Sequence, residues 1–155
     1  MASNRHLGRI VALQTLYEYE FRMGEEGSDI VIDEILERNI SRYDTAIDDK
    51  DFVKSLVHEV IAVMAELDLQ LQPIAPGWPI EQIARIDRNV LRIGLYELLH
   101  RADSVPPKVV INEAVELAKA FGADNSSKFI NGVLGTAFRT LVEGGQSDDA
   151  KNSEL

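Results

Sequence analysis

Three side chains able to bind phosphate stand close together near the start of the chain, namely Arg5, His6 and Arg9. On a helix, residues three or four positions apart share one face, and the positive end of the helix dipole lies at its first turn. Arginine presents a planar fork of donors that matches a phosphate group. The spacing predicts a small cationic surface, and an ordinary solvated helix start fits the same spacing.

A second group of side chains with binding chemistry lies in residues 121–129. It combines Lys128 and polar residues with two aromatic rings, Phe121 and Phe129. Aromatic rings beside basic and amide groups suit single-stranded RNA, whose unpaired bases stack on protein rings. The alternative is that both phenylalanines belong to the core and that residues 124–127 cap helices.

Catalytic and metal-binding patterns do not occur in the sequence. No two of the three histidines, His6, His58 and His100, stand at metal-ligand spacing, and there is no cysteine. Glycine-rich phosphate loops and the nucleophile motif of hydrolases are also absent. We therefore predict a protein that is not an enzyme and needs neither a metal nor a cofactor.

Composition favours a soluble globular protein of modest size. The chain has 155 residues, of which 45% are hydrophobic, and its formal net charge is −10. Residues 25–52 contain ten acidic and three basic residues, whereas the first 17 residues contain no acid. Because charges are screened within about 8 Å at physiological salt, a local basic surface is compatible with the negative total. No run approaches a membrane span, and the N-terminus lacks the pattern of a signal peptide.

Helical periodicity dominates the chain and predicts an all-α fold of about seven helices in two packed subdomains. A cluster of proline and glycine at residues 73–79 predicts the boundary between subdomains 1–72 and 79–143, which together form one domain. Asp103 or Ser104 is expected to cap the helix that begins near Pro107, and residues 144–155 are expected to form a disordered acidic tail. The expected helices cover residues 4–22, 29–41, 50–71, 79–84, 85–101, 107–121 and about 125–141.

Three segments resemble one known family. Residues 5–17, RHLGRIVALQTLY, resemble the opening arginine-rich helix of the transcription antitermination factor NusB family. Residues 86–98, IDRNVLRIGLYEL, are similar to the fifth helix of that family. The pair VVINEAVELAK and KFINGVL, at residues 109–119 and 128–134, is similar to its most diagnostic block. The match runs in order from about residue 4 to residue 141.

The resemblance implies a helical RNA-binding adaptor without catalytic activity. Family members bind the boxA element of ribosomal RNA leaders as a heterodimer with NusE, a small-subunit ribosomal protein, and join other Nus factors on RNA polymerase to suppress premature termination. Asp87 matches an acidic position used toward NusE, and Arg88 and Leu91, which lie nearby on that helix, are further partner-facing candidates. The matching RNA-facing positions are Arg5, His6, Arg9, Tyr17, Phe121, Asp124, Asn125, Lys128 and Phe129.

The sequence departs from the family pattern in its opening helix, where His6 and Leu7 stand at positions that are often basic. We therefore expect weak RNA binding by the chain alone and a strong dependence on NusE. Asn112, Glu113 and Asn131 fall in family motifs and are interpreted as buried groups that tie helix ends together. The alternatives are an RNA-recognition module that assists an RNA-modifying enzyme and a self-associating helical protein. The expected location is the bacterial cytoplasm.

Overall fold

The computed structural model describes residues 5–23 and 31–144, and every regular element in them is helical. The prediction of an all-α fold with about seven helices is confirmed, since these residues form seven α-helices and no strand. The chain divides into two compact units, Met1–Val63 and Met64–Leu155. The expected acidic tail lies, from residue 145 onward, outside the described residues.

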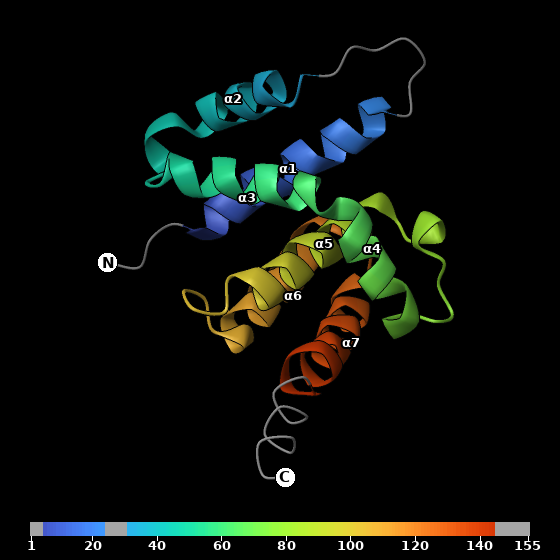
Figure 1. Ribbon diagram of the computed structural model, residues 1–155. Helices are drawn as coiled ribbons and strands as arrows, with labels where there is room; N and C mark the ends of the chain where they lie inside the picture. Colours follow the sequence, from blue (N-terminus) through green and yellow to red (C-terminus); the bar gives the residue numbers. More distant parts are fainter. Residues whose placement is uncertain (1–4, 24–30, 145–155) are drawn as a thin grey trace. The chain divides into compact units, whose positions relative to one another are not determined.

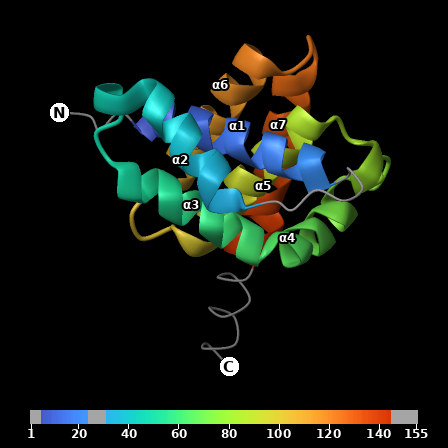
Figure 2. The same ribbon diagram turned by 90° about the horizontal axis from the view of Figure 1, so that it is seen from above.

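The first unit contains three α-helices, α1 (Arg5–Met23), α2 (Ile32–Tyr43) and α3 (Lys50–Ala62). Helix α1 lies beside both α2 and α3 (Figures 1 and 2). Asn39 of α2 donates to the hydroxyl of Thr15 on α1 over 3.1 Å, and both side chains are buried. The core of the first unit therefore consists mainly of leucine and isoleucine and also contains one hydrogen-bonded polar pair. Its fully buried large side chains are Leu13, Leu16, Ile35, Leu36 and Leu56.

Helix α3 begins where the sequence predicts, because an aspartate caps it. The Asp49 carboxylate accepts from the backbone N–H of Phe52 at 3.0 Å, which satisfies one donor of the first turn. This cap fixes Phe52 at the start of α3, where its ring faces α1.

The second unit contains α4 (Met64–Leu71), α5 (Arg85–His100), α6 (Pro107–Phe121) and α7 (Ser126–Ala137). Helices α6 and α7 form a hairpin, and α5 packs against both of them (Figure 1). Short 3₁₀ turns occupy Gln72–Ile74 and Ile80–Gln82, and a π-helical turn, Phe138–Glu143, follows α7.

A partly buried ion pair joins α4 to α5 inside the second unit. The Arg92 guanidinium donates to both carboxylate oxygens of Asp68, each over 2.8 Å, and also to Asn89 at 3.2 Å. Removing Asp68 would leave the buried guanidinium of Arg92 poorly compensated. Arg92 therefore has a structural role.

Several local expectations differ from the structure, since a 3₁₀ turn, Ile80–Gln82, replaces the helix expected over 79–84, and α7 ends at Ala137 instead of near residue 141. The single helix expected over 50–71 is interrupted at Val63, whose φ and ψ of −115° and 16° lie outside the helical range. The two compact units divide at that interruption, before the proline-rich segment that was expected to separate them. Pro106 occupies the N-cap position of α6, which has no side-chain cap, so neither Asp103 nor Ser104 caps it.

Candidate nucleic-acid and partner interface

The exposed cationic surface at the start of α1 is smaller than the spacing of Arg5, His6 and Arg9 predicts. His6 is exposed and Arg5 is half-buried, but only 3% of Arg9 is exposed. The guanidinium carbons of Arg5 and Arg9 lie 4.7 and 5.3 Å from the centre of the Phe52 ring, so α3 covers the face on which both arginines stand. The prediction that all three residues share an exposed face is wrong for Arg9. The accessible groups are His6 and part of Arg5.

The Arg5 side chain retains an unused donor. Its Nε atom is buried and makes no hydrogen bond with the described residues. Buried donors are almost always paired in proteins. Because Arg5 is half-buried and Arg9 almost fully buried, Arg5 is the stronger of the two arginine candidates for RNA contact.

An ion-pair cluster surrounds Glu18, further along α1. The hydrogen bond from Arg38 of α2 holds the pKa of the Glu18 carboxyl below its ordinary value, and Arg22 lies 3.2 Å from the same carboxylate. The neighbouring Tyr17, which the family resemblance places toward RNA, is exposed. Two guanidinium groups therefore balance the acid beside Tyr17.

The bend between α6 and α7 brings most of the predicted polar groups to the surface. Asp124, Asn125 and Lys128 are exposed, and 38% of Phe121 is exposed. The alternative that Phe121 belongs to the core is wrong, because α6 turns this side chain outward at its last residue. Asn125 stands at the N-cap position of α7 without making a side-chain cap. Its amide is therefore available to a ligand.

A buried serine fixes the conformation of this bend. The Ser126 hydroxyl donates to Asp87 on α5 at 3.0 Å and accepts from the Ala123 N–H at 2.8 Å. Gly122 permits this arrangement, since a Cβ atom there would lie 2.6 Å from the Ser126 side chain and 2.8 Å from the carbonyl oxygen of Ala118. The exposed groups of the bend are thus held on a rigid support.

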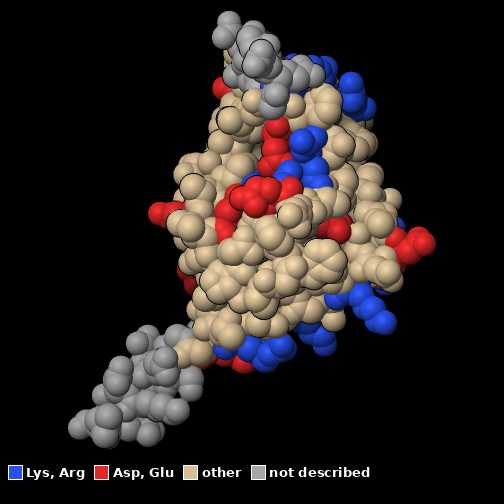
Figure 3. Space-filling view, turned by 90° about the vertical axis from the view of Figure 1, so that its right-hand side faces the viewer, with Lys and Arg blue, Asp and Glu red and all other residues tan. Residues whose placement is uncertain are grey.

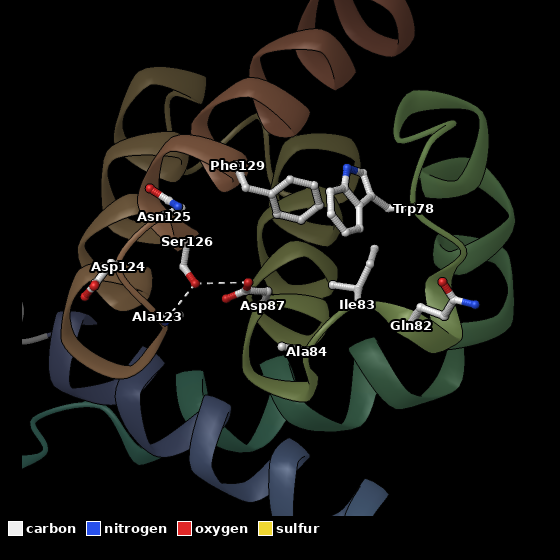
Figure 4. Close-up of a pocket in the computed structure, with 10 residues that line it drawn as sticks. All are labelled: Trp78, Gln82, Ile83, Ala84, Asp87, Ala123, Asp124, Asn125, Ser126 and Phe129. Atoms are coloured by element: carbon white, nitrogen blue, oxygen red, sulfur yellow. Dashed lines mark hydrogen bonds between the residues drawn. The ribbon is translucent and has the colours of Figure 1, made fainter.

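A cavity of about 570 Å³ lies between the bend, α5 and the loop that carries Trp78 (Figure 4). We call it the acidic cavity, because Asp87 and Asp124 line it and none of its lining residues is basic. Oδ1 of Asp87 is buried and makes no hydrogen bond with the described residues. The cavity can therefore accept a donor group, and its charge favours a cation.

Two aromatic rings form one wall of the acidic cavity. The rings of Trp78 and Phe129 meet edge to face, with their centres 6.1 Å apart, as Figure 4 shows. Trp78 is 57% exposed. Sequence reasoning missed this residue, although the only tryptophan of the chain, flanked by glycine and proline, could have indicated an exposed loop. Phe129 serves as a half-buried support of the cavity.

The three partner-facing candidates on α5 differ in accessibility. Asp87 lines the acidic cavity, and Arg88 is half-buried and donates to the Ile80 carbonyl at 3.1 Å. Leu91 is only 1% exposed, so its prediction as a partner contact is wrong. Leu91 lies one helical turn beyond Asp87, and its side chain points into the core.

Two asparagines that were interpreted as buried ties prove to be exposed. Asn112 on α6 and Asn131 on α7 make no hydrogen bond with the described residues. Both line a second cavity, at the other end of the α6–α7 hairpin. The interpretation of these amides as internal structural groups is wrong.

Charged groups on the face drawn in Figure 3 occur in small clusters of mixed sign on a mostly uncharged surface. Within residues 5–23 and 31–144, no helix is long and apolar enough to cross a membrane. The same residues contain no group of three or more acidic or histidine side chains arranged to hold a metal ion.

These features define a class of all-helical protein with a rigid polar bend and an adjoining acidic, aromatic cavity. Comparison with known proteins identifies the family. The NusB family profile matches residues 6–139, and the chain belongs to the NusB family.

Individual relatives match almost the full chain. The transcription antitermination protein NusB of Chloroflexus aggregans is 44% identical over 145 residues, which cover 92% of this chain and 93% of the relative. That of Dehalococcoides mccartyi strain CBDB1 is 38% identical over 143 residues, covering 92% and 95%. A solved structure of T. maritima NusB matches with a TM-score of 0.74 and 31% identity, covering 86% of this chain and 89% of the other.

Proposed function

We propose that this protein is a transcription antitermination factor. It binds the boxA element of ribosomal RNA leader transcripts together with NusE and helps RNA polymerase avoid premature termination. Family membership carries the proposal, because relatives that align with more than nine-tenths of both chains are named transcription antitermination proteins. Other Nus factors and RNA polymerase would be indirect partners, and the bacterial cytoplasm is the expected location.

The accessible polar groups support contact with a single-stranded RNA. At the α6–α7 bend, Lys128 can pair with a phosphate and the Asn125 amide can bond to a base edge, while the exposed ring of Phe121 offers a stacking surface. At the start of α1, Arg5 and His6 supply further donors to phosphate. The number of accessible basic groups is small, so we expect weak binding without NusE.

The acidic cavity supports contact with a basic protein. Its two carboxylates repel phosphate, whereas the unused oxygen of Asp87 and the rings of Trp78 and Phe129 suit a lysine or arginine side chain. We propose that such a side chain of NusE enters this cavity. The bend would then present Lys128 and Phe121 to RNA and the acidic cavity to NusE, with Asn125 at the border of the two.

The proposed adaptor has no catalytic role, as the family resemblance implies, and two of its histidines contact side chains of neighbouring helices or turns. His58 pairs with Asp33 at 2.8 Å on the exposed surface, and the His100 ring packs on Tyr96 with 5.1 Å between ring centres. Both contacts are those of side chains that stabilise helices.

The proposal is tested by a gel shift of labelled boxA RNA, with and without purified NusE, repeated over a series of salt concentrations. We expect weak binding by the chain alone and tight binding with NusE. Arg5→Ala should weaken the ternary complex and reduce the slope of log affinity against log salt by about 0.7, the value for one lost phosphate contact on a single strand.

Arg22→Ala is the matched control, because it removes the same charge from the opposite end of α1. Its effect on the salt slope should be smaller than that of Arg5→Ala. Equal effects would show that only net charge matters and would remove Arg5 from the RNA site. The absence of any boxA complex in the presence of NusE would contradict the proposed function itself.

A further inference from the structure

A second cavity lies at the end of the α6–α7 hairpin remote from the bend. Its volume is about 490 Å³. We call it the amide cavity, because two side-chain amides line it and no acidic residue does. Its lining includes Pro107, Lys108, Ile111, Asn112, Asn131 and Phe138.

The polar side chains of the amide cavity have no hydrogen-bond partners among the described residues. Asn112, Asn131 and Lys108 are all exposed, and none of their side chains makes a hydrogen bond or ion pair there. Each amide offers both a donor and an acceptor, and the ammonium group offers three donors. Two amides and one cation on neighbouring helices make a set of groups that can read a polar ligand.

We propose that the amide cavity binds one nucleotide of a single-stranded RNA. This inference rests on the proposed function, to which it adds a second RNA contact. Asn112 and Asn131 would bond to the edge of the base, as asparagine does with adenine, while the half-buried ring of Phe138 would stack on its face. Lys108 would pair with the phosphate.

The start of α6 reinforces the site for phosphate. Its first turn contains no acidic residue and its N-cap, Pro106, provides no side-chain cap. Pro106 and Pro107 have no N–H group and the N–H of Val109 donates to the Pro106 carbonyl at 3.0 Å, so the contribution of the helix start is the positive end of its dipole and the N–H of Lys108. A phosphate bound to Lys108 would therefore meet a favourable local potential despite the chain's total charge of −10.

Phe138, the aromatic residue of the amide cavity, lies in a segment with an unusual backbone conformation. Phe138 opens the π-helical turn Phe138–Glu143, and π-helical turns are rare and frequent at functional sites. An uncharged peptide segment could also bond to the two amides, but it would use neither the cation nor the face of an aromatic ring. A nucleotide uses all three kinds of group, so the lining favours RNA over a peptide.

The test is a titration of the full ¹⁵N-labelled chain, followed by nuclear magnetic resonance. The probes are AMP, UMP, inorganic phosphate and a blocked triglycine peptide. We expect a mononucleotide to shift the side-chain amide signals of Asn112 and Asn131 and the backbone amide of Lys108. Asn131→Ala should weaken nucleotide binding about fivefold or more, as for the loss of a base-edge contact.

Lys119→Ala is a control for the role of surface charge, since it removes an exposed lysine from the other end of α6. It should leave nucleotide binding unchanged. The proposal is overturned if neither mononucleotide moves the asparagine signals, if inorganic phosphate alone reproduces the shifts, or if only the peptide produces them. Unchanged signals of the α5 core in Asn131→Ala would establish that the variant folds.

Binding of boxA RNA in the presence of NusE separates this inference from the proposed function. If the chain takes up AMP but forms no complex with boxA RNA, the proposed function fails and the nucleotide site stands. If boxA RNA binds while mononucleotides leave Asn112 and Asn131 unmoved, the second site alone is rejected.

Discussion

The two ends of the α6–α7 hairpin carry cavities of similar size and opposite chemistry. The acidic cavity, at the bend, combines two carboxylates with two aromatic rings and lacks a basic residue. The amide cavity, at the open end, combines a lysine with two asparagines and lacks an acidic residue. Helix α6 has 15 residues and is about 22 Å long, so the two sites are separated by most of its length.

It follows from this difference that the net charge of a protein does not indicate where an anionic or a cationic ligand binds. A total of −10 argues against nucleic acid when taken alone. Within one hairpin, however, the lining charge changes from two acids to one base, over a distance longer than the screening length at physiological salt. The two ends can therefore recognise ligands of opposite charge.

The largest effect that we predict from this comparison is the loss of affinity for NusE when a charge is removed from the acidic cavity. Asp87→Asn keeps the shape of the side chain and can still accept from Ser126. If a cation of NusE occupies the cavity, the affinity for NusE should fall about thirtyfold or more, as for a buried charge pair that loses one partner. Isothermal titration calorimetry with NusE measures the loss.

The control for this variant is Asp124→Asn, at the exposed rim of the same cavity. A rim charge acts mainly on the rate of association, so its effect on the affinity for NusE should be much smaller. Comparable losses in both variants would mean that the cavity contributes only a diffuse negative field and that no side chain enters it.

A pair of glycine substitutions tests how differently the two ends are packed. Gly122→Ala would force a Cβ atom to within 2.6 Å of Ser126 and 2.8 Å of a backbone oxygen. We expect a loss of about 1–3 kcal/mol in the free energy of unfolding, typical of overpacking. Gly132→Ala, in α7, would meet nothing within 4 Å and should stabilise the protein by about 0.5–1 kcal/mol.

Chemical denaturation of both variants measures the two effects. Opposite signs would confirm that the bend is rigid and that the open end has free space around Gly132. A Gly122→Ala variant as stable as the wild type would show that the bend adjusts easily, and Ser126 would no longer count as its fixed support.

Much of the secondary structure could be predicted from the sequence, because local chemistry determines it. Apolar periodicity places α1, α5 and α6 within one residue of their expected ends. Asp49 caps α3 through a contact three residues away, which is local enough to be read from the chain. The fold class follows from the same periodicity, since no segment alternates as a strand would.

The errors concern interactions between elements. Arg9 and Leu91 stand on helix faces whose exposure depends on which helix covers them, and spacing alone does not reveal the neighbour. The exposure of Asn112 and Asn131 is equally hidden in the sequence, because a polar residue within a strong motif fits a buried tie as well as an exposed group. The interruption at Val63 carries no glycine or proline, and the apolar stripe continues across it.

The smallest expected effect is a spectral one, and it distinguishes the ligands of the two cavities without any substitution. Trp78 is the only tryptophan of the chain and stands, half exposed, at the acidic cavity. Binding of NusE should remove water from its ring and shift its emission to shorter wavelength. AMP, bound at the far end of α6, should leave the emission maximum unchanged. A shift with AMP but none with NusE would reverse the assignment of the two cavities, because the aromatic cavity would then be the nucleotide site.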